Sequence, residues 1–356
     1  MKLGLGLYRH MLTPENFDFA RQCGCTHLVV HLVDYFHQGG GDRQNQPVGS
    51  TAGWGRAGDP ARLWSYEELA ALKAEINSHG LEWHAIENLD PAHWHDVLLD
   101  GPKKLQHLEN VKTIIRTMGR AGIPVLGYNF SLPGVAGRIS GPFARGGAIS
   151  VGMDGPDETP IPNGMIWNMV YDPYAPPGNR PSITSEQLWQ RLADFLAAVV
   201  PVAEEAGVTL AAHPDDPPLP VLRQQPRLVY QPRLYQRLID LKPSPRNALE
   251  FCVGTLAEMT EGDIYEVVDH YSRQDKVAYV HLRNVHGRAP HYRETFIDDG
   301  DVNALRVLEI LHRNRFEGVI IPDHTPQMAC SAPWHAGMAF ALGYFRAVLQ
   351  RFQSGG

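Results

Sequence analysis

Short apolar runs alternate along the chain with stretches whose apolar residues recur at helical spacing. Each run is bounded by glycine, proline or polar residues and has the length of a buried β-strand. These runs predict strands at 3–8, 27–33, 81–87, 123–128, 209–213, 247–252, 277–281 and 318–323. The stretches between them predict helices at 13–22, 65–78, 103–120, 184–206, 232–241, 262–271, 302–314 and 333–352. The pattern is therefore eight strands, each followed by a helix.

Eight βα repeats predict an α/β protein with the (β/α)₈ TIM-barrel fold. A barrel of this kind takes about 250 residues, and the chain has 356. The surplus falls mainly in long βα loops after the second, fourth and fifth strands, which open on the face where such barrels carry their active sites. No linker or change of composition marks a second domain, so we expect residues 1–356 to form a single domain.

The longest break in the periodic pattern is the segment 129–182. It is rich in glycine and proline and shows little periodicity. A loop of this length inside a compact domain is usually functional rather than incidental. We therefore expect this segment to lie over the active-site face as a lid or binding loop.

Composition and charge exclude several classes of partner. Hydrophobic residues make up 43% of the chain and charged residues 20%, and the net charge is -7. A negative chain without a basic stripe does not predict a nucleic-acid partner. The apolar runs are too short to cross a membrane, and the first residues enter a strand without a signal-peptide pattern. Four cysteines without zinc-ribbon or redox spacing fit a reducing cytoplasm, so we expect a cytoplasmic protein.

Side chains that bind metals stand at the ends of strands five to eight. His213 is followed by Pro214, which cannot donate to a sheet and so ends the strand. Cys252, His281 and Asp323 end the next three strands in the same way. These strands are neighbours around a barrel, so their ends converge, and the four residues predict a catalytic divalent metal that acts as a Lewis acid. The alternative is that the histidines are ordinary strand-end residues and the cysteine a small packed one.

Four other polar residues are candidates for the same face. Asp215 and Asp216 follow His213 directly and could act in acid–base chemistry or bind substrate, although they also suit a tight turn. Glu87 ends the third strand and Arg9 follows the first, so both are expected to point into the mouth of the barrel as substrate contacts. Each is about as readily explained by a structural role.

Arg283 and His324 are the remaining catalytic candidates. Arg283 lies two residues beyond His281, so strand alternation directs both side chains to the same side. Its guanidinium could hold a substrate carboxylate through two parallel hydrogen bonds. His324 adjoins Asp323, and imidazole exchanges protons near neutral pH, which makes it a candidate for proton transfer.

Several of these motifs together resemble the mannonate dehydratase family. The similarity rests on Ala212-His-Pro-Asp-Asp-Pro-Pro218, Glu250-Phe-Cys-Val-Gly-Thr255, His281-Leu-Arg-Asn-Val285, Asp298-Asp-Gly-Asp301 and Pro322-Asp-His324. It extends more loosely to Glu87, Tyr128-Asn129-Phe130 and Trp167.

The resemblance implies a xylose-isomerase-like barrel that uses manganese and dehydrates D-mannonate to 2-keto-3-deoxygluconate. It implies that His213, Cys252, His281 and Asp323 bind the metal and that His324 is catalytic. We also expect Asn129 to contact the substrate. Thiolate is a soft ligand, so the residues by themselves leave zinc or iron open beside manganese.

Two departures from the family pattern concern the substrate. After Phe130 the family carries an aromatic segment with a Trp-Thr-Arg run, where this chain reads Ser131-Leu-Pro-Gly-Val-Ala-Gly-Arg138. The family's catalytic tyrosine has no clear counterpart before Tyr344, and Trp334-His335 stands in that region. The metal site therefore carries over better than the identity of the sugar.

The chain is accordingly expected to be a metal-dependent hydro-lyase that removes water from a small sugar acid, most simply D-mannonate. One alternative is a sugar isomerase or epimerase on the same barrel, which needs no acid for a leaving group. Another is a barrel that binds a sugar acid without turning it over. Barrels of this kind often associate through their outer helices, so we also expect a homo-oligomer.

Overall fold

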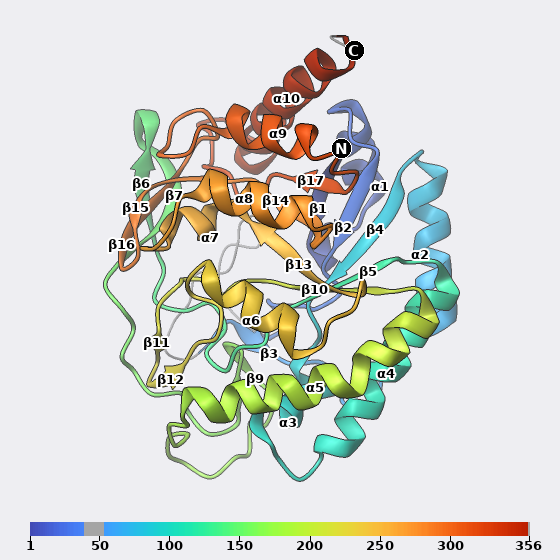
Figure 1. Ribbon diagram of the computed structural model, residues 1–356, viewed down its shortest axis with the longest axis vertical. Coiled ribbons are helices and arrows are strands. Elements are labelled where there is room, and N and C mark those ends of the chain that lie inside the picture. The colour runs from blue at the N-terminus through green and yellow to red at the C-terminus, as the bar shows by residue number, and fades with distance from the viewer. Residues whose placement is uncertain (39–52, 355–356) are drawn as a thin grey trace.

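The chain forms a closed barrel of eight parallel strands surrounded by helices, as its hydrophobic pattern predicts (Figure 1). The computed structural model describes residues 1–38 and 53–354. Neighbouring strands around the barrel follow the order β1-β17-β14-β13-β10-β5-β4-β2, and β2 pairs with β1 to close the ring. In chain order these strands are β1 (Lys2–Leu7), β2 (His27–Val30), β4 (Glu82–Glu87), β5 (Val125–Tyr128), β10 (Thr209–Ala212), β13 (Asn247–Cys252), β14 (Val277–His281) and β17 (Val319–Ile321).

One of the predicted helices follows each barrel strand and packs outside it. These helices are α1 (Pro14–Gln22), α2 (Tyr66–Ser78), α4 (Lys104–Ala121), α5 (Ser185–Ala206), α6 (Arg233–Leu241), α8 (Ile264–Arg273), α9 (Ala304–Arg313) and α10 (Pro333–Ser354). Each begins and ends within about two residues of its predicted bounds. Two short helices were not predicted, α3 (Pro91–Leu99) and α7 (Val253–Glu258), and two 3₁₀ turns lie at η1 (Arg9–Met11) and η2 (Arg145–Gly147).

Two apolar layers hold the barrel together. The inner one fills the barrel with small and branched side chains around Tyr279, namely Val29, Ala85, Val125, Ala211, Val319 and Ile321. The outer one joins the strands to the apolar faces of the helices. Because parallel strands are covered on both faces, their sequences are continuous apolar runs, which is why these strands could be recognised from the sequence.

The helix ends follow the local sequence. Ser65 and Glu68 form a reciprocal capping box at the start of α2, and Thr184 and Gln187 form another at the start of α5. Glycine at the carboxyl end of α5, Gly207, has a φ of 70°, a left-handed conformation that costs glycine little. These local signals fix where the chain turns back toward the next strand.

The segment 129–182 is more ordered than its sequence predicts, and the expectation of little regular structure there is wrong. It contains a hairpin of β6 (Ile139–Ala144) and β7 (Ala148–Asp154). β7 pairs with β16 (His291–Thr295), which pairs with β15 (Asn284–Arg288), so a four-stranded antiparallel sheet stands beside the barrel (Figure 1). Gly141 and Pro142 inside β6 interrupt the alternation of this strand, and Gly146 and Gly147 form the hairpin turn.

Two smaller sheets complete the loops above the barrel. β8 (Met165–Ile166), β9 (Met169–Val170) and β3 (Gly55–Arg56) form one. β11 (Val221–Leu222) and β12 (Gln225–Pro226) form the other, in the loop after β10. The first joins the loop after β2 to the segment 129–182, and the second folds the loop after β10 on itself.

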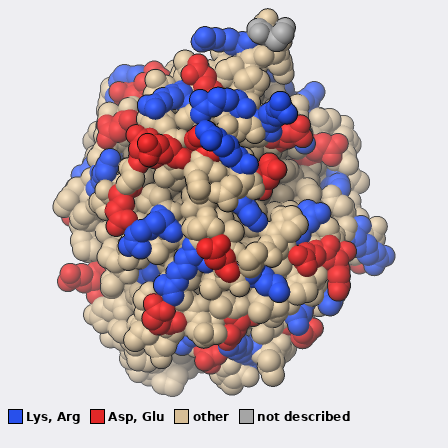
Figure 2. Space-filling view, viewed as in Figure 1, with Lys and Arg blue, Asp and Glu red and all other residues tan. Residues whose placement is uncertain are grey.

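Charged side chains of both signs are interspersed on the face of the molecule shown in Figure 2. Positive and negative groups alternate over the helices there, with no large area of one sign on this face. Among the helices that the structure describes, none is both long enough and apolar enough to span a membrane.

Candidate active site

A cavity opens where the carboxyl ends of the barrel strands meet. Its empty space measures about 870 Å³, the open mouth included. Side chains from seven barrel strands or the loops after them line it, together with residues of the segment 129–182 and of α10. The lining includes Tyr8, His31, Tyr35, Trp54, Glu87, Asn129, Arg138, Trp167, His213, Asp216, His281, Asp323, His324 and Trp334.

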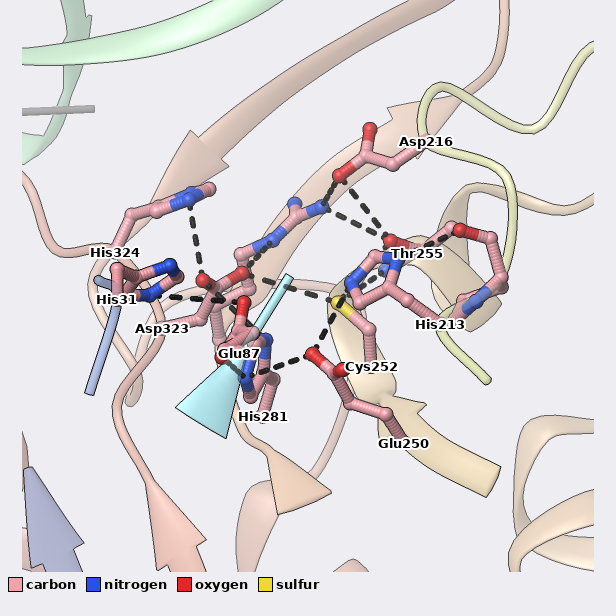
Figure 3. Close-up of polar contacts among 12 residues, drawn as sticks. His31, Glu87, His213, Asp216, Glu250, Cys252, Thr255, His281, Asp323 and His324 are labelled. Carbon is pink, nitrogen blue, oxygen red and sulfur yellow. Dashed lines mark hydrogen bonds and ion pairs between the residues drawn. The ribbon is translucent and has the colours of Figure 1, made fainter. Parts of the chain in front are cut away.

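The structure brings the four predicted ligands together at this cavity: His213, His281 and Asp323 line it, and Cys252 adjoins them (Figure 3). One side-chain donor atom each from His213, Cys252 and His281 lies within 4.8 Å of the others. Asp323 adjoins them, with Oδ1 3.4 Å from His281 Nδ1 and Oδ2 3.8 Å from Cys252 Sγ. Four strand ends far apart in sequence therefore present two imidazoles, a thiol and a carboxylate to one space.

The hydrogen bonds of the two imidazoles leave one nitrogen of each available as a ligand. His281 Nε2 donates to Glu87 Oε2 at 3.1 Å, while the buried Nδ1 makes no hydrogen bond within residues 1–38 and 53–354. His213 Nδ1 donates to the carbonyl of Pro214 at 2.6 Å, so Nε2 is the nitrogen that would bind a metal once its proton has left. A second partner that fixes the tautomer in this way is the usual arrangement around a metal-binding histidine.

Cys252 is placed to ionise. It is the N-cap of α7, and its sulfur accepts hydrogen bonds from the Thr255 amide at 3.5 Å and hydroxyl at 3.1 Å. Burial alone would raise the pKa of the thiol, but Arg283, His213 and His281 outweigh burial and lower that pKa to about 6. The sulfur is thus a thiolate at neutral pH, the form that binds metals.

Neighbouring carboxylates and the thiol favour the protonated form of both ligand imidazoles. Burial lowers the pKa of an imidazole, yet Glu250 and Cys252 raise the pKa of His213 to about 10. In the same way Glu87 and Asp323 hold the pKa of His281 well above its usual value despite burial. A bound divalent cation would take the place of these protons, so the donor set and its charge fit such an ion.

Glu250 was missed in the sequence. It lies two residues before Cys252 on β13, and its Oε1 lies 3.1 Å from His281 Nε2. Burial and the neighbouring Glu87 raise the pKa of Glu250, whereas His31 and His281 lower that of Glu87 against burial. The alternation of β13 could have indicated Glu250, because residues two apart share a face.

His324 is held by a carboxylate from outside the barrel. Its Nδ1 lies 3.1 Å from Glu294 Oε1, and its Nε2 lies 3.1 Å from Asp323 Oδ1. Glu294 belongs to β16, in the antiparallel sheet that also contains β6 and β7. No spacing in the sequence pointed to Glu294, because the accessory sheet places it.

Arg283 is placed differently from the expected substrate clamp. Its guanidinium is almost completely buried and donates to Asp216 at 2.8 Å, Glu258 at 2.6 Å and Asp323 at 3.0 Å. Because its nitrogens donate to these carboxylates, Arg283 holds Asp216 and Asp323 in position and does not face the cavity itself. Asp216 does line the cavity, and its buried Oδ1 has no hydrogen-bond partner within the described chain.

A second arginine, Arg138, faces the cavity instead. It is 4% exposed, and its Nε and Nη1 have no hydrogen-bond partner among the described residues. Asp216 and Glu294 lie 3.8 Å and 3.7 Å from its Nη1 and balance its charge without close contact. A buried guanidinium with free donors beside the predicted ligands is a ready-made site for an anionic group.

Two predicted residues lie elsewhere. Asp215 accepts from Arg227 Nε at 2.6 Å and from the Leu228 and Val229 amides at 2.7 and 2.8 Å, so it anchors the loop after β10 instead of facing the cavity. Arg9 is exposed on η1 and borders a separate hollow near α2. The turn at η1 directs Arg9 outward, and Tyr8 lines the cavity in its place.

A second group of possible ligands, His95, Asp96 and His107, is buried between α3 and α4. His107 Nδ1 accepts from the Asp96 amide at 3.0 Å, and His95 Nδ1 donates to the Pro91 carbonyl at 2.8 Å. The lone pair of His107 Nδ1 is taken by this amide, so the same nitrogen cannot also bind a metal. This group lies outside the barrel mouth and has a ready structural explanation.

The fold and the strand-end donors together define a class, a xylose-isomerase-like barrel with a site fit for a divalent metal. The family profile described as D-mannonate dehydratase (UxuA) matches residues 48–136 and 179–350. The chain therefore belongs to the mannonate dehydratase family, a family of hydro-lyases. Its segment 137–178, which includes Arg138 and Trp167, falls outside the matched residues.

Curated relatives agree with this assignment, and solved structures share the fold. The chain is 31% identical over 280 residues to the mannonate dehydratase of Streptococcus pneumoniae, covering 74% of this chain and 75% of that one. It is 30% identical over 275 residues to mannonate dehydratase 2 of Halalkalibacterium halodurans, covering 74% and 79%. The crystal structure of mannonate dehydratase from Streptococcus suis superposes with a TM-score of 0.75 at 23% identity, covering 100% of this chain and 94% of that one. L-ribulose 3-epimerase shares the fold, with a TM-score of 0.57 at 14% identity, covering 99% and 96%.

Proposed function

We propose that the protein dehydrates a sugar acid of the D-mannonate type to a 2-keto-3-deoxy acid, with a divalent metal bound by His213, Cys252, His281 and Asp323. The observation that carries the proposal is the convergence of these four strand-end donors, with the buried Nδ1 of His281 left without a hydrogen bond among the residues that the structure describes. Relatives named mannonate dehydratase support the choice of substrate.

The bound ion would supply Lewis-acid stabilisation of the negative charge that develops when the proton beside the carboxylate leaves. Manganese is the proposed ion because the family resemblance implies it, and zinc and iron remain the alternatives that a thiolate ligand favours. Glu87 holds the His281 ring by its Nε2 and so directs Nδ1 toward the other ligands. This contact supports the same ligand set.

We assign substrate binding to Arg138, Asp216 and Asn129. The free donors of Arg138 can hold the substrate carboxylate in the position that Arg283 was expected to hold it. The free Oδ1 of Asp216 can accept a hydrogen bond from a sugar hydroxyl. Asn129 lines the cavity and is itself fixed by Trp167 and Pro214. These contacts would orient carbons two and three toward the catalytic groups.

Proton transfer is assigned to His324. Its Nδ1 is held by Glu294, which orients the ring and leaves Nε2 facing the cavity beside Asp323. From there His324 can exchange a proton with carbon two or with the hydroxyl that leaves carbon three. Arg283 is a positioning residue in this scheme, since it holds Asp216 and Asp323 from behind. Asp215 supports the loop that carries Asp216.

The segment 129–182 is proposed to cover the site and to set the choice of sugar. Asn129, Val135, Arg138 and Trp167 all line the cavity, which supports this role.

We also propose that the protein is a cytoplasmic homo-oligomer that acts on a free sugar acid. Sedimentation analysis of the purified protein tests the oligomer.

The function is tested by incubating the manganese-loaded protein with D-mannonate and following formation of a 2-keto-3-deoxy acid, with deuterium exchange at carbon two in parallel. We expect both exchange and product. Exchange or epimerisation without the keto-deoxy product would place the protein among the isomerases. Binding without exchange or product across a panel of aldonates would indicate a sugar-acid-binding barrel.

A further inference from the structure

Part of the active-site cavity is aromatic. Tyr35, Trp54 and Trp167 all line it, and their ring centroids are 5.7 Å (Tyr35–Trp54), 5.6 Å (Tyr35–Trp167) and 5.5 Å (Trp54–Trp167) apart. These three rings come from the loop after β2 and from the segment 129–182, and we call them the aromatic wall. They are buried against each other, so they form one rigid surface rather than three separate contacts.

The polar atoms of the aromatic wall are committed to the protein, with one exception. The Tyr35 hydroxyl lies 3.0 Å from His31 Nδ1 and accepts from Asn88 Nδ2 at 3.0 Å. Trp167 Nε1 donates to Asn129 at 3.3 Å. Trp54 is 7% exposed, and its buried Nε1 has no hydrogen-bond partner in the described part of the chain. A buried indole N–H normally has an acceptor, so a ligand oxygen is the expected partner.

This surface matches a sugar ring better than an open sugar chain. An open-chain aldonate carries a hydroxyl on every carbon beyond the carboxylate, and each buried hydroxyl needs a hydrogen-bond partner. Judged on residues 1–38 and 53–354, the aromatic wall offers one free donor, Trp54 Nε1. A pyranose ring instead has a face of C–H groups that can pack on aromatic rings, with oxygens at its edge.

We infer that the preferred substrate is an aldonate that carries a second sugar as a pyranose ring, an aldobionate, with that ring against the aromatic wall. The inference rests on the proposed function, because it assumes that the carboxylate end lies at Arg138 and the predicted metal ligands. Trp167 belongs to the segment 137–178, which lies outside the match to the family profile.

The test compares D-mannonate with 4-O-β-D-mannopyranosyl-D-mannonate, which has the same configuration at carbons two and three. Binding of each to the full-length, manganese-loaded protein is measured by titration calorimetry, and turnover is followed in parallel. We expect the aldobionate to bind at least about tenfold more tightly, a difference of about 1.4 kcal/mol. Trp54→Ala should remove most of this preference, and Trp54→Phe, which keeps a ring but loses the N–H, should remove part of it.

Trp64→Ala is the matched control, because Trp64 borders the separate hollow near α2 and not the active-site cavity. It should leave the preference unchanged. Equal or tighter binding of D-mannonate, or a preference that survives Trp54→Ala, would overturn the inference. Tight, Trp54-dependent binding of the aldobionate without turnover would uphold the aromatic wall and count against the proposed dehydration instead. Turnover of D-mannonate without tighter binding or turnover of the aldobionate would uphold the proposed dehydration and count against the aromatic wall as a sugar-binding surface.

Discussion

Two clusters in this protein contain histidine and carboxylate side chains. One is the predicted ligand set at the barrel mouth, and the other, the helical cluster, is formed by His95, Asp96 and His107 between α3 and α4. They differ in what the ring nitrogens of their histidines contact. At the barrel mouth, His213 Nδ1 and His281 Nε2 donate to a backbone carbonyl and to Glu87, so that the other ring nitrogens, His213 Nε2 and His281 Nδ1, are turned toward the remaining predicted ligands. Between α3 and α4, His107 Nδ1 is taken by a backbone amide. Proximity of histidines and carboxylates is common to both clusters, so proximity does not identify a metal site.

The charge around the two clusters differs as well. Neighbouring anions raise the pKa of His213 and His281 at the mouth. In the helical cluster, burial and the neighbouring His95 lower the pKa of His107 to about 4, so that ring is neutral. The mouth thus attracts positive charge and the helical cluster excludes it. The four predictions below test this contrast.

The largest expected effect is loss of metal from the mouth. Cys252→Ser with His281→Ala should bring bound divalent metal from about one equivalent to near zero and abolish turnover, because two of four ligands are gone. His95→Ala with His107→Ala is the matched control and should keep its metal. Elemental analysis of protein purified without added metal or chelator measures both. Metal retained by the Cys252→Ser, His281→Ala variant and lost from the His95→Ala, His107→Ala variant would place the metal site between α3 and α4 instead.

Removal of the proton-transfer group should leave the metal in place. His324→Ala is expected to lower kcat by about 10²–10⁴-fold, the range for general acid–base catalysis, with metal content unchanged. Glu294→Gln should lower kcat less and leave KM for the sugar acid nearly unchanged, with partial recovery in Glu294→Asp. A kcat for His324→Ala within a factor of two of the parent would exclude the assignment.

The ion-pair network behind the mouth should be needed for folding, in contrast to the helical cluster, which contains no arginine. Arg283→Met leaves Glu258 and Asp216 buried without their partner, so the free energy of unfolding should fall by about 3–5 kcal/mol. Arg313→Met, which breaks an exposed pair with Asp269, should cost less than about 1 kcal/mol. Urea unfolding of the two variants provides the measurement, and equal midpoints would contradict the structural role given to Arg283.

The smallest effect is a pH dependence in the helical cluster. The pKa of His107 is about 4 in the folded protein and 6.5 in the unfolded one, so the unfolded chain binds the proton more readily between these values. The free energy of unfolding should therefore fall as pH drops from about 6.5 to 4, by on the order of 2 kcal/mol from this residue. His107→Gln should show a flatter profile in chemical denaturation over that range. If the free energy of unfolding changed with pH in the same way in the parent protein and in His107→Gln, the fold would not hold His107 neutral.

The sequence by itself determined the barrel and its four strand-end donors. Parallel strands covered on both faces must be apolar throughout, and caps such as Ser65 with Glu68 act within one helical turn. Because successive strands end at the same face, His213, Cys252, His281 and Asp323 could be assigned to one place without coordinates. These signals are local, and the repeat of the fold extends them to the whole chain.

Only the tertiary structure decided how the rest of the site is built. Glu294 reaches His324 because β16 joins β7 in a sheet that no local pattern announces. Arg138 rather than Arg283 faces the cavity because carboxylates far apart in sequence converge on Arg283. Glycines and short strands hide such pairing, and its energy comes from contacts across long stretches of chain, so residue types alone do not reveal which polar group is left free to meet a ligand.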